Sequence, residues 1–188
     1  MSLLAGNCQG SGGSLGNPKM LHLARLITST NVQVIFVSET RNSRLTWSDL
    51  LNRLNVDDAH IVPAQGQSGG LWFLSRNGVQ LDVLESSHHF FFALCVHKHL
   101  QKKFGLVCVY GDPHHLQTAR IWRQVQNFVV TYPSLPFICM GDLNDIMHPS
   151  EKLGPRVANA RQISEFCCLV KDCGFFLLGL QRHCVHLD

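Results

Sequence analysis

The sequence predicts a layered α/β fold, formed as one domain by residues 1–188. Short β-branched or aromatic runs alternate with stretches of helical periodicity, which is the pattern of strand–helix–strand units. Near the middle of the chain, apolar runs separated by short turns indicate an antiparallel meander. Hydrophobic residues are 45% and charged residues 15% of the chain, a composition that excludes a disordered polymer. The net charge of +3 permits a polyanionic partner without requiring one.

Each expected element follows from local pattern and from the turn residues around it. Strands are expected over short apolar runs, at 2–7, 32–37, 58–63, 69–74, 79–85, 90–96, 104–110 and 137–140, with a further strand starting at Phe175. Helices are expected where apolar residues recur at helical spacing, from Asn17–Pro18 onward and over 45–54, 116–130 and 160–172. Residues 9–16 and 148–159 are rich in glycine or proline and are expected to be loops.

The run Phe137–Met140 is predicted to be the central strand. It is apolar throughout and lies between Pro136 and Gly141, as expected for a strand with both faces covered. Asp142 and Asn144 follow it, two residues apart, so an extended chain would project both side chains to the same side. A carboxylate and an amide in this position suit proton transfer and phosphate binding, although Gly-Asp-x-Asn is also a turn sequence.

Three other predicted strands also carry a polar residue at their end or just after it. They are Asn7, Glu39 and Tyr110. In open α/β folds the carboxyl ends of strands meet at a crevice where ligands bind, so the acid, amide and phenol groups would gather there. Together they suit a metal-assisted phosphodiester site. Taken singly, each has an ordinary explanation as a turn residue, a solvated carboxylate or an aromatic side chain at a strand end.

Four short runs contain these residues in a fixed order: Asn7–Gly10, Val37–Thr40, Tyr110–Pro113 and Gly141–Asn144. Their order resembles the endonuclease/exonuclease/phosphatase superfamily, which has the DNase-I-like fold. Further runs are similar to the endonuclease domain of plant non-LTR (LINE-type) retrotransposons: Arg120–Trp122, Glu151–Gly154, Phe166–Gly174 and Leu178–Gln181. The resemblance extends from Asn7 to about Gln181 and implies a four-layer α/β sandwich, with two packed mixed sheets flanked by helices.

The resemblance implies a role for each of these residues. Glu39 would bind the catalytic Mg²⁺, with Mn²⁺ as an alternative ion, and Asn7 would position the phosphate or the metal-bound groups. Tyr110 would stabilise the scissile phosphate. Asp142 would orient or activate the attacking water, and Asn144 would hold the pentacovalent transition state. The implied activity is hydrolysis of a phosphodiester that nicks one strand of DNA, with DNA as the partner.

Two departures from the family pattern lower the expected activity. Gln9 stands where many relatives carry an acidic residue. The family's later Thr-Trp strand, a further Asp and a terminal Ser-Asp-His are not found in the 188 residues, and His183 and His186 stand too early in the order to replace the final histidine. We therefore expect a domain without its last strands, of marginal stability and with little or no nicking activity, because losing an acid/base group costs about 10²–10⁴-fold.

Two other functions stay open at this point. A non-catalytic remnant of the fold would bind nucleic acid or protein through basic residues, although scattered solubilising charge explains them as well: Arg41, Arg44, Lys98, Lys102 and Lys103. Within the superfamily, a phosphatase acting on phosphoinositides or a nuclease acting on RNA would keep the same fold.

The eight cysteines are expected to be free thiols in a reducing, intracellular compartment, with the nucleus as one candidate. Neither a signal peptide nor a membrane-spanning segment is visible in the sequence. A zinc site is not expected, because the spacing of the late Cys and His residues fits no standard finger: Cys167, Cys168, Cys173, His183, Cys184 and His186. No obligate protein partner is evident either.

Overall fold

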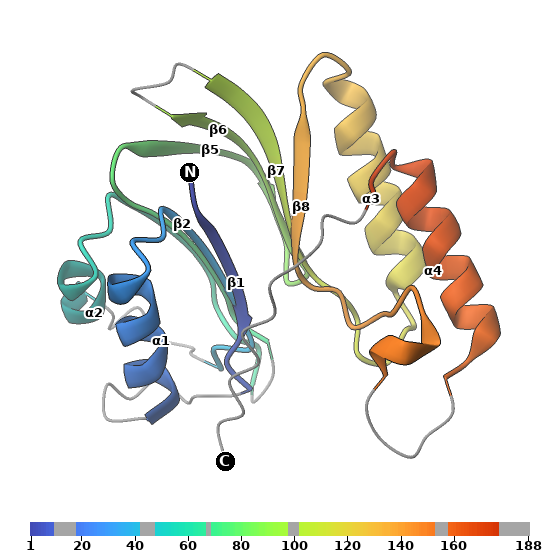
Figure 1. Cartoon of the computed structure of the whole chain (residues 1–188), viewed down its shortest axis with the longest axis horizontal. Coiled ribbons are helices and arrows are strands. Elements are labelled where there is room, and N and C mark those ends of the chain that lie inside the picture. Colours follow the sequence, from blue (N-terminus) through green and yellow to red (C-terminus); the bar gives the residue numbers. More distant parts are fainter. Residues whose placement is uncertain (10–17, 42–47, 67–68, 98–101, 153–157, 177–188) are drawn as a thin grey trace.

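The chain folds into two mixed β-sheets that pack face to face (Figure 1). This computed structural model describes residues 1–9, 18–41, 48–66, 69–97, 102–152 and 158–176. The first sheet has the strand order β1 (Leu3–Asn7), β2 (Val34–Ser38), β4 (Leu71–Ser75), β3 (Asp58–Val62). The second has the order β5 (Val79–Ser86), β6 (Phe90–His97), β7 (Lys102–Tyr110), β8 (Phe137–Asp142). Strands β5 to β7 form the predicted antiparallel meander.

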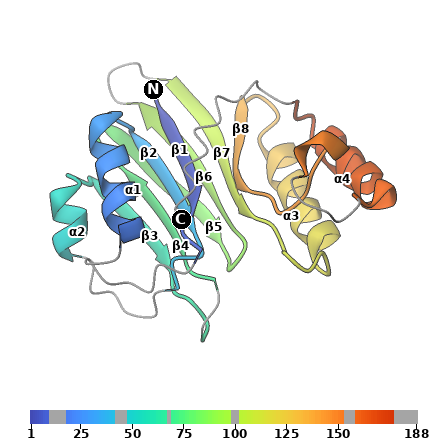
Figure 2. The ribbon, with the colours of Figure 1, turned by 60° about the horizontal axis from the view of Figure 1, so that its bottom comes forward.

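Helices cover the outer face of each sheet, which completes the four layers that the sequence predicts. Helices α1 (Pro18–Ser29) and α2 (Ser48–Arg53) lie on the first sheet, and α3 (Thr118–Thr131) and α4 (Ala160–Asp172) lie on the second. Figure 2 shows the two helix pairs on opposite sides of the molecule, with the sheets between them. A short 3-10 helix, η1 (Pro149–Glu151), precedes α4. Among the described residues, no helix is long and apolar enough to cross a membrane.

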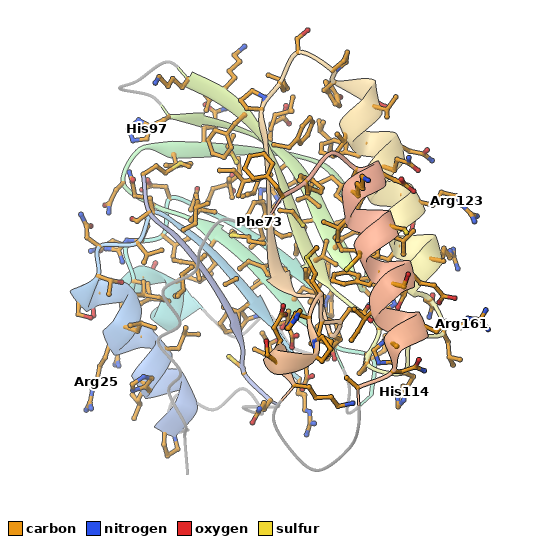
Figure 3. The ribbon with its side chains drawn as sticks, turned by 45° about the vertical axis from the view of Figure 1, so that its right-hand side comes forward. Arg25, Phe73, His97, His114, Arg123 and Arg161 are labelled. Carbon is orange, nitrogen blue, oxygen red and sulfur yellow. The ribbon has the colours of Figure 1, made fainter. Side chains whose placement is uncertain are left out.

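Aromatic side chains fill the space between the two sheets. Phe36 and Phe73 of the first sheet meet Phe91 of the second, with the Phe73 and Phe91 rings stacked at a centroid distance of 5.4 Å. All three side chains are fully buried, and Figure 3 shows Phe73 in the middle of the molecule. Burying a phenylalanine stabilises a fold by roughly 1.5–3 kcal/mol relative to exposure. This core therefore fixes how one sheet lies on the other, and with it the relative positions of their strand ends.

The prediction of a central, fully buried strand at Phe137–Met140 is wrong. Strand β8 pairs with β7 alone within the described part of the chain, and each of its residues is only half-buried. Its two faces do contact apolar clusters, Ile138 on the inter-sheet side and Phe137 on the helix side. The inner positions belong to β6 and β7, and the residues of β7 are buried from Phe104 to Tyr110. A short apolar run does not reveal whether a strand has neighbours on one side or on both.

Several sequence-level expectations concern residues outside the described ranges. The loop over 10–16, the residues Arg44 and Lys98, and the late His183 and Cys184 all lie there. Residues 175 and 176 belong to no strand, and the rest of the strand expected to begin at Phe175 lies outside the described ranges. The seven cysteines within the described ranges are free thiols, as the sequence predicts. Burial raises the pKa of the Cys95 and Cys139 thiols to about 12, which removes them as nucleophiles near neutral pH.

Candidate active site

Two parallel strand pairs, one in each sheet, end at the same edge of the sandwich. In the first sheet β1 runs parallel to β2, and Asn7 is the partner of Ser38, the residue before Glu39. In the second sheet β7 runs parallel to β8, and Tyr110 is the partner of Asp142. The register of each pair therefore places two polar residues side by side at a strand end. The packing of the sheets then brings these two ends together.

Hydrogen bonds across the sheets join these four residues into one network. The amide Nδ2 of Asn7 donates to Oδ2 of Asp142 over 2.6 Å and to Oε1 of Glu39 over 3.1 Å. The hydroxyl of Tyr110 donates to the same Glu39 oxygen over 2.8 Å. The sequence reasoning expected these side chains to gather at converging strand ends, and the structure brings all four into contact.

The orientation of the Asn7 amide is fixed by Gln9, the residue that stands where many relatives of the resembled family carry an acidic side chain. The backbone N–H of Gln9 donates to Oδ1 of Asn7 over 2.7 Å. Because a backbone N–H is only a donor, it requires the amide oxygen on its own side and turns the Nδ2 group toward the two carboxylates. Gln9 has a left-handed backbone with φ of 43° and an exposed side chain. Its contribution to the network is therefore made by its main chain.

Asn144 is joined to this network through its backbone, while its side chain bonds elsewhere. Its backbone N–H donates to Oδ1 of Asp142 over 3.2 Å, and its Nδ2 donates to the carbonyl oxygen of Gly111 over 2.8 Å. Both Asn144 and Glu39 have left-handed backbones, with φ of 52° and 53°. A residue other than glycine in this region costs of order 1–3 kcal/mol and persists where the surrounding structure enforces it, often at functional sites.

The electrostatics of the network keep Tyr110 protonated. Burial of the phenol, followed by the hydrogen bond and the negative charge of Glu39, raises the pKa of Tyr110 far above its ordinary value, and the charges of Asp142 and Asp112 act in the same direction. At neutral pH the phenol is therefore a hydrogen-bond donor at the mouth of the site. The phenol has one proton, so it can stabilise negative charge on a phosphate oxygen only after its hydroxyl turns away from Glu39.

The residues present fit a magnesium ion. Mg²⁺ binds through one or two carboxylates and completes its octahedron with water and substrate phosphate, and Glu39 and Asp142 both lie within hydrogen-bonding reach of one amide group. The described residues contain no group of three or more His, Cys, Asp or Glu side chains able to enclose a metal. A site of this composition would hold the ion loosely and depend on the substrate for further oxygen ligands. Glu39 and Asp142 are the carboxylates of the network that could hold it.

Sequence reasoning missed a second set of polar residues around the site. Asp112 is 6% exposed, and its carboxylate accepts hydrogen bonds from the backbone N–H groups of His114 and Gln117. Burial alone would raise the pKa of Asp112, but these N–H donors hold it below its ordinary value. The ring of His89 lies parallel to that of Tyr110, with centroids 6.5 Å apart. Asp112 stands in the run Tyr110–Pro113 that carries the family resemblance, but no role of its own was inferred for it from the sequence.

The basic residues considered as phosphate contacts are not all near this site. Lys102 and Lys103 begin β7, whereas Tyr110 ends it. At about 3.3 Å per residue, these lysines lie about 23–26 Å from Tyr110 along the strand. Arg41 follows Glu39 by two residues and is exposed, which makes it the nearest of the described candidates along the chain.

Two mixed sheets between helix pairs, with polar side chains at the ends of their parallel strands, define the DNase-I-like class of α/β sandwiches. A model of the Endonuclease/Exonuclease/phosphatase family matches residues 5–166, which include all five site residues. The chain belongs to this family. A comparison with curated protein sequences gave no match.

Solved structures similar to this chain come from several branches of the same fold. The AP endonuclease LMAP from Leishmania major superposes with a TM-score of 0.65 at 13% identity, over 90% of this chain and 65% of the other. The endonuclease domain of TRAS1, a telomere-specific non-LTR retrotransposon, superposes with a TM-score of 0.60 at 14% identity, over 91% of this chain and 70% of the other. The 3′ phosphatase NExo from Neisseria, bound to a product DNA hairpin, superposes with a TM-score of 0.58 at 12% identity, over 90% of this chain and 70% of the other. The chain spans about two thirds of the length of these proteins.

Proposed function

We propose that this domain is a divalent-metal-dependent phosphodiesterase that nicks one strand of DNA, of the kind carried by non-LTR retrotransposons. The observation that supports this proposal is the hydrogen-bonded network of Asn7, Glu39, Tyr110 and Asp142 across the two sheets. It gathers two carboxylates, a phenol donor and an amide at one edge of the sandwich. A DNA substrate in a plant cell would place the protein in the nucleus.

In this proposal the residues divide the work of an in-line displacement at phosphorus. Asp142 accepts the proton of the attacking water, whose oxygen forms the new bond to phosphorus as the bond to the leaving sugar oxygen breaks. Tyr110, once its hydroxyl turns away from Glu39, and Asn144 donate hydrogen bonds to the non-bridging oxygens, where negative charge increases in the transition state. Asn7 holds Asp142 and Glu39 in register through its amide. Bound at Glu39, Mg²⁺ would supply charge neutralisation at the phosphate and leaving oxygen.

The test is conversion of supercoiled plasmid to nicked circle with Mg²⁺, with EDTA as the metal control. The matched variants are Asp142→Asn and Asp82→Asn, because Asp82 is an exposed residue of β5 and undergoes the same chemical change. We expect slow nicking by the 188-residue chain and by Asp82→Asn, and a rate at least about 10²-fold lower in Asp142→Asn. Equal nicking by both variants, or nicking that survives EDTA, contradicts the proposal.

Phosphatase activity is the second candidate, because the fold neighbours include the 3′ phosphatase NExo and a mannosyl-6-phosphatase from Bacteroides thetaiotaomicron, the latter with a TM-score of 0.57 at 14% identity. The same preparations are therefore assayed with a 3′-phosphorylated DNA oligonucleotide and an RNA hairpin. Metal-dependent release of phosphate without strand nicking would assign the site to phosphomonoesters. Cleavage of the RNA in preference to the plasmid would assign it to RNA.

A further inference from the structure

His89 lies beside the candidate active site, in the short turn that joins β5 to β6. Phe90, the first residue of β6, is the register partner of Val109, which places the turn next to Tyr110 at the end of β7. Ser87 closes this turn, because its N–H donates to the carbonyl oxygen of Phe90 and its hydroxyl accepts from the N–H groups of His89 and Phe90. The position of His89 is therefore fixed by the local backbone.

Both the main chain and the side chain of His89 bond to the main chain of Tyr110. The N–H of Tyr110 donates to the carbonyl oxygen of His89 over 2.7 Å, and Nδ1 of His89 lies 3.2 Å from the carbonyl oxygen of Tyr110. Since a carbonyl oxygen only accepts hydrogen bonds, Nδ1 carries the proton in this contact. Tyr110 thus selects the Nδ1–H tautomer, and the bond needs no charge on the imidazole.

The imidazole ring also lies along the phenol ring of Tyr110. The planes of the two rings are 14° from parallel, and their centroids are 6.5 Å apart. On the other side of Tyr110, β7 pairs with β8, where Asp142 is its register partner. Tyr110 is therefore held between the β5–β6 turn and β8, at the point where β7 ends.

The phenol of Tyr110 needs a fixed position for its contact with Glu39. Its hydroxyl reaches Oε1 of Glu39 over 2.8 Å. Hydrogen bonds between two oxygens span only about 2.5–3.0 Å, so a small displacement of the phenol ring breaks this contact. The phenol proton can turn about its C–O bond from Glu39 to a phosphate oxygen while the ring stays in place. A ring that is held firmly can therefore serve both acceptors in turn.

We propose that His89 is a positioning residue for Tyr110, and that the bond from Nδ1–H to the carbonyl oxygen of Tyr110 holds the phenol in place against Glu39. In this tautomer Nε2 is an acceptor, so His89 acts through Tyr110 and not by donating to a phosphate oxygen. The use of the held phenol in phosphodiester cleavage rests on the proposed function, whereas the positioning of the phenol does not.

The test compares two variants of nearly the same shape. His89→Leu and His89→Asn both branch at Cγ, but only Asn keeps an N–H group attached to Cγ, as Nδ1 is in histidine. His89→Phe is a second variant without the donor, and it retains a ring. The matched control is His88→Leu, because His88 is the exposed neighbour in the same turn and its Nε2 lies 2.7 Å from Nε2 of Gln65. All variants are made in the Tyr132→Phe background, which leaves Tyr110 as the only phenol.

The first readout is the midpoint of tyrosinate absorbance as the pH is raised, with circular dichroism of each variant as the check on folding. Loss of the positioning bond frees the phenol from Glu39, so His89→Leu and His89→Phe should each lower the midpoint by about half a pH unit or more, the scale of one hydrogen bond. His89→Asn and His88→Leu should stay within about 0.2 pH units of the parent. Unchanged midpoints in His89→Leu and His89→Phe, or a shift in His89→Asn as large as that in His89→Leu, overturns the proposal.

The second readout is plasmid nicking in Mg²⁺. His89→Leu should lower kcat about tenfold and leave KM within about twofold of the parent, because the phenol acts on charge that develops in the transition state. His89→Asn should restore most of this loss. Equal kcat values in His89→Leu and His89→Asn would overturn the role of His89 in cleavage. Lowered tyrosinate midpoints in a chain that does not nick plasmid would contradict the proposed function and leave the positioning of Tyr110 standing.

Discussion

The hydroxyl of Tyr110 donates a 2.8 Å hydrogen bond to Oε1 of Glu39, and this bond joins the end of β7 in one sheet to the residue after β2 in the other. The two residues are 71 positions apart in the sequence. Together with the bond from Asn7 to Asp142, it connects the sheets at their polar edge. The raised pKa of Tyr110 therefore depends in part on a carboxylate supplied by the opposite sheet.

The pKa of Tyr110 is expected to fall when Glu39 is replaced by Gln. Burial is the largest cause of its raised pKa, and the hydrogen bond and charge of Glu39 come next. Because the folded-state pKa lies above the ordinary value of 10.0, this phenol adds stability that is fully present below pH 10 and is lost as the pH rises above it. The chain has two tyrosines, so a Tyr132→Phe background leaves Tyr110 as the only phenol.

The measurement for Tyr110 is the ultraviolet absorbance of tyrosinate as the pH is raised. Glu39→Gln in the Tyr132→Phe background should shift the midpoint to lower pH, while Asp82→Asn in the same background should leave it unchanged. Identical midpoints for the parent and Glu39→Gln would show that Glu39 does not act on the phenol in solution.

Magnesium is expected to stabilise the folded chain, and Glu39→Gln should lose most of that effect. A ligand that binds only the folded state adds about 2.7 kcal/mol when its concentration is 100 times its dissociation constant. The measurement is the midpoint of thermal unfolding with Mg²⁺ and with EDTA. Glu85→Gln, an exposed residue of β5, is the matched control and should keep the wild-type shift. If Mg²⁺ raises the unfolding midpoint of Glu39→Gln as much as that of Glu85→Gln, the ion binds at a site other than Glu39.

Replacement of Asp112 by Ala is expected to lower the free energy of unfolding by about 1–3 kcal/mol, because it leaves the N–H groups of His114 and Gln117 without their acceptor. The lowered pKa of Asp112 means that the ionised form stabilises the fold. This contribution is present above the ordinary value of 3.8 and disappears as the pH falls through the lower folded-state pKa.

The measurement for Asp112 is urea unfolding of the wild type, Asp112→Ala and Asp112→Asn from pH 7 downward. The difference in free energy of unfolding between the wild type and Asp112→Asn should become smaller below about pH 3.8. The difference between the wild type and Asp82→Asn should not change in this way. If the difference in free energy of unfolding between the wild type and Asp112→Asn stays constant with pH, the charge of Asp112 contributes nothing to stability.

Gly141 is expected to tolerate no side chain, whereas Gly6 is expected to tolerate one. At Gly141, with φ of 144°, a Cβ atom would lie 1.9 Å from the carbonyl oxygen of Val109 on the neighbouring strand. At Gly6 a Cβ atom would meet nothing within 4 Å. Gly141→Ala should therefore lower the free energy of unfolding by about 3 kcal/mol or more, while Gly6→Ala should change it by less than about 1 kcal/mol. Denaturant unfolding of both variants gives the comparison, and similar stabilities would contradict the tight contact between β7 and β8.

The sequence by itself determined the elements and singled out the candidate site residues. Helical spacing of apolar residues predicted α4 over the same residues that the structure gives, and apolar runs bounded by turn residues predicted the strands to within a few residues. Asn7, Glu39, Tyr110 and Asp142 could be singled out because each lies at the end of such a run or just after it. These signals are local, since periodicity and turn chemistry act over a few residues.

Only the tertiary structure decided which of these residues touch. The bond from Asn7 to Asp142 spans 135 positions and depends on the packing of Phe73 against Phe91. The order of strands in the second sheet places β8 at the edge beside β7. The contact between His115 and Asp145 was invisible in the sequence for the same reason. Register and sheet packing are set by the burial of side chains far apart in the chain, and no local pattern encodes them.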